Sequence, residues 1–167
     1  MRRNLFTFLI VFTAFFTTQS VWAESVFVCP DLSKAKQVGD CPTEADLKRY
    51  FKSTCGWANK PGKKKPDLCD SIEGYKLRKN IALWESGDQE FMGYLTCNTP
   101  PAKIKAAKSV RVAVSERAGI YKVACGYEGG LTLTYRTRMV CKIPGAEPSK
   151  SSSNCGPDAA SCKVVCE

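Results

Sequence analysis

Basic side chains recur at alternating positions in residues 109–143, and these side chains could bind a ligand. Lys122 lies between Tyr121 and Val123, and Arg136 follows Tyr135. Such alternation predicts strands with one apolar and one wet face. Positive charges gathered on one sheet face attract anions. The candidate ligand-binding residues of this stretch are Arg111, Lys122, Arg136 and Arg138.

A second basic group lies in residues 59–70, where two prolines and a glycine interrupt any regular element. Such a run can bind heparin-like polymers or nucleic acid, and it can equally be a solvated turn. No aromatic residue is interleaved with these lysines, so the stacking platforms that bases use are missing and nucleic acid is not an expected partner. The candidate binding residues of this loop are Lys63, Lys64 and Lys65.

The absence of histidine limits the chemistry that the chain can perform. It excludes Ser-His-Asp and Cys-His catalysis, histidine-based ribonucleases and the usual zinc hydrolases. No P-loop or dinucleotide fingerprint occurs, and no cofactor is expected. A carboxylate pair of the kind that glycosidases use remains open, although spacing does not show whether two carboxylates converge. The candidates for such a pair are Glu85, Asp88, Glu90, Glu116 and Glu128.

Cysteine is the other chemically active residue type, with ten copies, all after residue 23. An even number of cysteines in an exported chain predicts a framework of up to five disulfides. No C-x-x-C pair occurs, so a metal site is not expected. The ten disulfide candidates are Cys29, Cys41, Cys55, Cys69, Cys97, Cys125, Cys141, Cys155, Cys162 and Cys166.

Residues 1–23 have the pattern of a secretory signal peptide. Arg2 and Arg3 precede a short apolar run, and Val21-Trp22-Ala23 is a small-x-Ala cleavage site. We expect cleavage after Ala23 and a location in the periplasm or outside the cell. No later apolar run is long enough to span a bilayer, so no transmembrane segment is expected in the mature chain. Losing both arginines lowers the net charge from +9 to about +7, and a basic exported protein tends to meet anionic surfaces.

Residues 109–143 predict three antiparallel strands of one meander. Side chains of one face must oppose one another, and a slip of one residue would expose the apolar set. Val114 therefore opposes Val123 across a two-residue turn, Ala118-Gly119. A three-residue turn, 128–130, places Cys125 opposite Leu133.

This register has two consequences for the chemistry. Cys125 cannot bond to Cys141 while the hairpin holds. Lys122 faces Arg136 directly, with Arg111 and Arg138 expected close by. Like charges in direct opposition are destabilising, so the side chains splay into water or an anion lies between them.

Other segments complete the expected fold. Residues 43–53 predict a helix with a capping-box start at Thr43 and Asp46. Residues 75–84 and 91–97 predict a further strand pair. The fold class is therefore mainly β (α+β), an antiparallel meander sheet with one N-terminal helix, stapled by disulfides. After the leader, residues 24–143 form the β-rich domain, 144–154 a linker by composition, and 155–167 a cysteine-rich tail bonded back to the body.

Several short motifs resemble those of small exported cysteine-rich proteins of gamma-proteobacteria. The matching features are Cys29-Pro30-Asp31, the isolated Trp84, the strand 123–127 and the alternating strand after it. The resemblance covers residues 29–143, and the tail cysteines depart from it. It implies a periplasmic or secreted β-domain and supplies no active site.

Three functions are compatible with these observations. The first is a non-enzymatic exported domain that binds an anionic or protein surface, such as an envelope, glycan or host component. The second is a secreted inhibitor or effector that acts on a protein partner through a disulfide-held loop, either 59–70 or 98–108, because a rigid loop loses little entropy on binding. The third is a small carboxylate-dependent hydrolase.

Overall fold

The computed structural model describes residues 24–57, 66–146, 151–156 and 159–167. The expected signal peptide, 1–23, and the basic residues Lys63, Lys64 and Lys65 lie outside this part of the chain. Within it, no helix has the length and apolar character to span a membrane.

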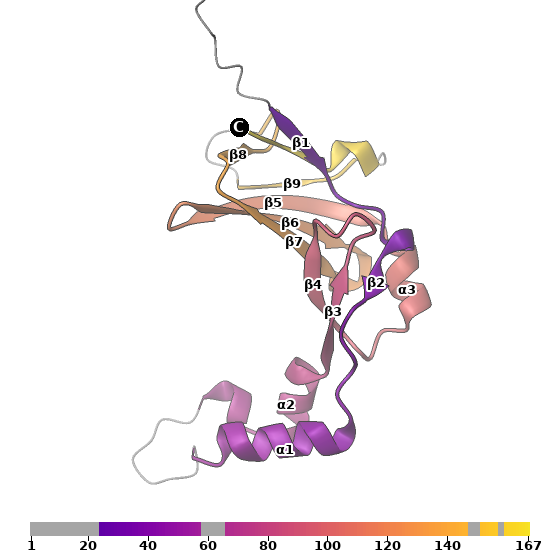
Figure 1. The fold of residues 1–167 in the computed structure, drawn as a ribbon, viewed down its shortest axis with the longest axis vertical. Helices are drawn as coiled ribbons and strands as arrows, with labels where there is room; N and C mark the ends of the chain where they lie inside the picture. The colour runs from indigo at the N-terminus through magenta and orange to yellow at the C-terminus, as the bar shows by residue number, and fades with distance from the viewer. Residues whose placement is uncertain (1–23, 58–65, 147–150, 157–158) are drawn as a thin grey trace, which may run out of the picture.

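Two antiparallel sheets stacked face to face make up the body (Figure 1). The larger has seven strands in the order β2-β3-β4-β7-β6-β5-β9, and the smaller has three in the order β1-β10-β8. The large-sheet strands are β2 (Lys36–Gln37), β3 (Ile81–Glu85), β4 (Met92–Thr96), β5 (Ser109–Arg117), β6 (Ile120–Tyr127), β7 (Thr132–Thr137) and β9 (Ser152–Asn154). Those of the small sheet are β1 (Ser25–Val28), β8 (Cys141–Lys142) and β10 (Lys163–Cys166). The mainly β fold class with disulfide staples is confirmed.

The predicted register of the meander is confirmed in its central part. Val114 opposes Val123, and Cys125 opposes Leu133. Ala118 and Gly119 form the first turn with φ of 52° and 75°, the left-handed pair that a two-residue hairpin with the correct twist requires. The second turn is the three-residue 3₁₀ segment Glu128–Gly130.

Two ends of the meander differ from the prediction. The third strand does not run on to Ile143: β7 ends at Thr137, whose Oγ1 accepts a hydrogen bond from the Met139 N–H at 3.1 Å. The chain turns there, and β8 pairs with β10 in the small sheet. On β5, a bulge at Val110 puts this side chain, 44% exposed, outside the core, because a bulge reverses the alternation locally.

The core lies between the two sheets. Val112, Val123 and Leu133 of the large sheet and Val164 of the small sheet are almost fully buried. The rings of Phe27 and Tyr135 close one edge of this core, with centroids 4.5 Å apart. Burying apolar surface from both sheets is what holds them together.

Two α-helices form a second, smaller unit at the end of the molecule away from the small sheet (Figure 1). The predicted helix is α1 (Glu44–Cys55), and both hydrogen bonds of the Thr43–Asp46 capping box are present. It packs on α2 (Ile72–Lys79) around its own buried cluster, which includes Leu47 and Tyr75. The strand predicted for 75–84 is therefore wrong in its first half, because Ser71 caps a helix there and Tyr75 is buried against α1. A third helix, α3 (Pro101–Ala106), lies against the 3₁₀ turn η1 (Leu32–Lys34).

All ten cysteines are paired. The pairs are Cys29–Cys125, Cys41–Cys97, Cys55–Cys69, Cys141–Cys166 and Cys155–Cys162. The excluded Cys125–Cys141 bridge is absent, as predicted, because each of the two sulfurs bonds elsewhere. The bond from Cys141 to Cys166 ties the tail to the body, which is also confirmed. Such a framework is typical of an oxidising, exported compartment.

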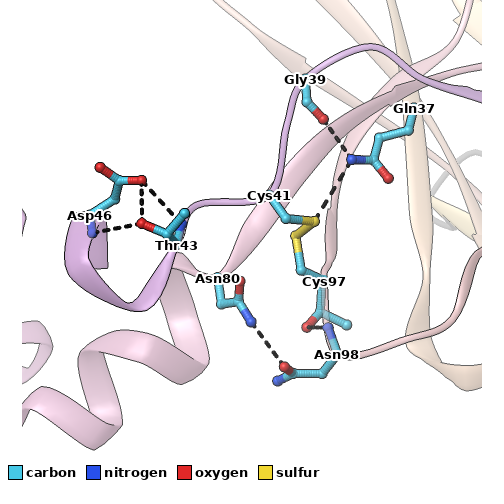
Figure 2. Close-up of a disulfide and its surroundings, with 9 residues drawn as sticks. Gln37, Gly39, Cys41, Thr43, Asp46, Asn80, Cys97 and Asn98 are labelled. Carbon is cyan, nitrogen blue, oxygen red and sulfur yellow. Dashed lines mark hydrogen bonds between the residues drawn. A yellow bond between two sulfur atoms is a disulfide. The ribbon is translucent and has the colours of Figure 1, made fainter. Parts of the chain in front are cut away.

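One bridge fixes the helical unit to the large sheet (Figure 2). Cys41, just before α1, bonds to Cys97, which follows β4. Asn80 Nδ2, at the end of α2, donates a hydrogen bond to Asn98 Oδ1 at 2.9 Å beside the bridge. A covalent link and an amide pair therefore hold the junction between the two units.

The segment predicted to be a linker, residues 144–154, is partly a β-strand. Ser152–Asn154, inside the predicted linker 144–154, form β9 and pair with β5. Backbone hydrogen bonds to β5 hold β9 at the edge of the sheet, so the strand does not need large apolar side chains. A serine-rich composition therefore does not reveal that the segment is a strand.

Candidate functional site

The face of the large sheet opposite the core, called here the outer face, carries the candidate residues. One line of directly opposed residues, called here the central row, crosses six strands of this face. The neighbouring line, two residues along the strands, includes Arg111 opposite Gly126. Short side chains dominate the middle of the face, so it is flat. The central row consists of Glu85, Met92, Thr134, Ala124, Ala113 and Ser152.

The basic residues of the outer face gather toward the tip of the β5–β6 hairpin. Lys122 lies directly opposite Arg136 on β7, and on its other side it faces Ser115. Lys122 is half-buried and Arg136 is exposed. Among the described residues neither forms an ion pair, since the salt bridges found there involve Glu44, Asp46 and Glu167. The predicted like-charged pair is therefore present without a carboxylate to neutralise it.

Arg111 and Arg138 are not adjacent to this pair, although the sequence placed them close by. Arg111 lies opposite Gly126, four residues along β6 from Lys122, which is about 13 Å at the rise of a strand. Its Nη2 donates a hydrogen bond to Ser152 Oγ at 2.7 Å, so it is held beside β9. Arg138 lies beyond the end of β7, in the bend that leads away from the sheet.

Arg117 is a basic residue of the outer face that the sequence analysis missed. It ends β5 opposite Ile120, two residues along from Ser115 and on the same face. Extending the alternation of the first strand by one step would have found it. Arg117, Lys122 and Arg136 together are called the hairpin cluster.

An exposed aromatic side chain also lies on this face. Tyr94 is 69% exposed and lies two residues after Met92 on the same face of β4, and Met92 opposes Thr134 in the central row. The weak alternation of the strand 91–97 did not assign Tyr94 to a face. The outer face therefore combines a flat centre, a basic cluster at one end and an exposed aromatic ring on a neighbouring strand.

Carboxylates line two open clefts near β1, and Asp88 lines both of them. Asp88 and Glu90 line one open cleft beside β1, but Asp88 serves the β3–β4 turn, accepting hydrogen bonds from the Ser86 hydroxyl and the Glu90 N–H. In a neighbouring depression lies Asp31, whose pKa is lowered by hydrogen bonds from Ser33. A general acid at neutral pH needs the opposite shift.

The loop 98–108, named as a possible inhibitory loop, is anchored to the body. It contains α3, and Ile104 of this helix is 1% exposed. Glu128 Oε2 accepts a hydrogen bond from the Lys108 N–H at 3.2 Å at its far end. The other loop, 59–70, lies largely outside the described residues.

Within the described residues, no group of three or more metal-ligating side chains could hold a metal ion. Comparisons with protein families, with curated proteins and with solved structures find no significant match to the chain. The outer face therefore has to be interpreted from its own geometry and charge.

Proposed function

We propose that this protein is an exported, non-enzymatic binding domain whose outer face holds an anionic surface such as an envelope, glycan or host component. The observation that carries the proposal is the direct opposition of Lys122 and Arg136 with no ion-pair partner among the described residues. Like charges in this position cost stability. An anion bound between them offsets that cost.

The shape of the outer face supports a polymer or an extended surface as the ligand. Sites for small molecules are usually concave and enclose most of the ligand, whereas the centre of this face carries the short side chains of Ala113, Ala124 and Thr134. Arg111 lies about 13 Å along the strands from Lys122. An extended anionic chain can reach both positions, and a single small anion cannot.

Chromatography on immobilised heparin tests the proposal. We expect Lys122→Glu with Arg136→Glu to elute at clearly lower salt than the wild type, because contacts between protein cations and a polyanion release counterions and make binding salt-dependent. The matched control is Lys103→Glu with Lys105→Glu on α3, which makes the same charge change on exposed residues away from the outer face.

Net charge alone predicts equal shifts for the two double variants. If the outer-face variant and the α3 variant elute together, the outer face is a solvated surface and the proposal is wrong. Adding Arg117→Glu to the outer-face variant should lower the elution salt further, because Arg117 belongs to the hairpin cluster.

A further inference from the structure

The strand β1 is an edge of the small sheet, and its outward side is open. It pairs with β10 on one side, and no other strand of the described chain pairs with it. The Cys29 N–H donates to Cys162 O at 2.8 Å just past the strand. Because antiparallel partners alternate in which residues exchange hydrogen bonds, Ser25 and Phe27 also face β10. The N–H and C=O groups of Val26 and Val28 therefore point away from the sheet.

The side chains of this edge are unusually apolar for an open strand. Val26 is 57% exposed and Val28 is 43% exposed. Natural edge strands are commonly protected by charged side chains, prolines or bulges, and Ser25–Val28 has none of these. Phe27 is turned the other way and packs on Tyr135, which fixes the strand in position.

A cleft of about 560 Å³ runs along this edge. All four residues of β1 line it, and the turn between β3 and β4 contributes Asp88 and Glu90. Its charged lining residues are thus both acidic, in a chain whose net charge is +9. The charge of this cleft is opposite to that of the molecule as a whole, so it selects a ligand that the rest of the surface repels.

We propose that β1 accepts an extended basic peptide segment of a partner protein, which adds to the small sheet as a fourth strand. The peptide backbone pairs with the outward N–H and C=O groups of Val26 and Val28, the mode of β-strand addition. Apolar side chains of the peptide pack beside the two valines, and a lysine or arginine at an alternate position meets Asp88 and Glu90. This site is separate from the outer face, and it has the opposite charge preference.

A blocked synthetic peptide with alternating valine and lysine tests the proposal on the full mature chain. The readouts are the affinity, from a fluorescence titration, and the hydrogen exchange of single backbone amides. We expect the peptide to slow exchange at Val26 and Val28, whose amides have no hydrogen-bond partner among the described residues. A peptide with glutamate in place of lysine should bind about tenfold more weakly or not at all.

Val26→Pro removes one outward N–H while leaving the β1–β10 hydrogen bonds in place, because proline is tolerated on the solvent side of edge strands. We expect about tenfold weaker binding from the lost hydrogen bond and the altered edge. The matched control, Val26→Thr, keeps the N–H and should bind almost as the wild type does. If Val26→Pro does not fold, Glu90→Lys tests the acidic side without altering β1, with an expected loss of about fivefold.

Four results overturn the proposal: no binding of the lysine peptide, equal affinity of Val26→Pro and wild type, stronger binding of the glutamate peptide, or dimerisation that already protects Val26 in the free protein. In the last case a second copy of the chain occupies the edge.

Discussion

Arg136→Glu should stabilise the fold while it weakens binding to a polyanion. In the wild type Lys122 and Arg136 face each other across β6 and β7. Cross-strand ion pairs contribute about 0.2–1 kcal/mol, and like charges in direct opposition cost a similar amount. Replacing repulsion by attraction should therefore raise the free energy of unfolding by about 1 kcal/mol at low salt.

Urea unfolding with the disulfides intact measures this change. The gain should appear as a higher midpoint with an unchanged dependence on urea concentration, because the surface exposed on unfolding stays the same. Raising the salt to about 1 M shortens the Debye length to about 3 Å and should remove most of the gain. The salt dependence separates an electrostatic effect from a change in side-chain packing.

Arg138→Glu is the matched control, since it makes the same charge change beyond the end of β7, where no residue lies opposite in the sheet. We expect its free energy of unfolding to stay close to that of the wild type. Equal gains in the two variants would refute the reasoning, because they would reflect the net charge of the molecule. A loss of stability in Arg136→Glu would also refute it, by showing that Arg136 has a stabilising partner.

Three further predictions concern the body of the fold. Replacing Cys29 and Cys125 by alanine removes a bridge that spans 96 residues and should lower the free energy of unfolding in urea by about 4 kcal/mol, and a loss below about 1 kcal/mol would contradict this. Burial raises the pKa of Tyr127, and Asp31 and Asp88 raise it further; the stability that this residue adds is full below about pH 10 and falls at higher pH. Tyrosine absorbance should therefore show a last-titrating group that Tyr127→Phe removes, and a profile unchanged by the variant would contradict it. Gly93→Ala would place a Cβ 2.3 Å from the Thr132 carbonyl oxygen and should separate β4 from β7, with a loss of roughly 2 kcal/mol or more in thermal unfolding; wild-type stability would show that the strands can move apart freely.

The central register could be derived from the sequence because hairpins are local. Face parity and the glycines of the two turns determined that Val114 opposes Val123 and that Lys122 opposes Arg136. The same parity excluded a Cys125–Cys141 bridge before any pairing was known. Neighbours within a hairpin are close in sequence, so their positions follow from alternation and turn length alone.

Other elements could not be derived because distant segments decide them. The alternation continues through Met139 and Cys141, yet β8 leaves the meander to pair with β10, where Cys141 bonds to Cys166. Nothing near Cys141 in the sequence reports a bonding partner 25 residues further on. Tyr75 likewise carries a strand-like residue type, but packing against α1 decides that it lies in a helix.

The two proposed binding surfaces differ in the same way. The outer face is built from consecutive hairpins, so its basic pair could be predicted from the sequence, whereas the positions of Arg111 and Arg138 relative to that pair were predicted wrongly. The open edge of β1 exists because the last strand of the chain pairs with the first, with Ser25 opposite Cys166. The disulfide from Cys141 to Cys166 and the ladder to β8 hold that last strand in place. Weakening the contacts that hold β10 should therefore disturb the acidic cleft beside β1 before it disturbs the outer face. The register of the meander does not depend on β10.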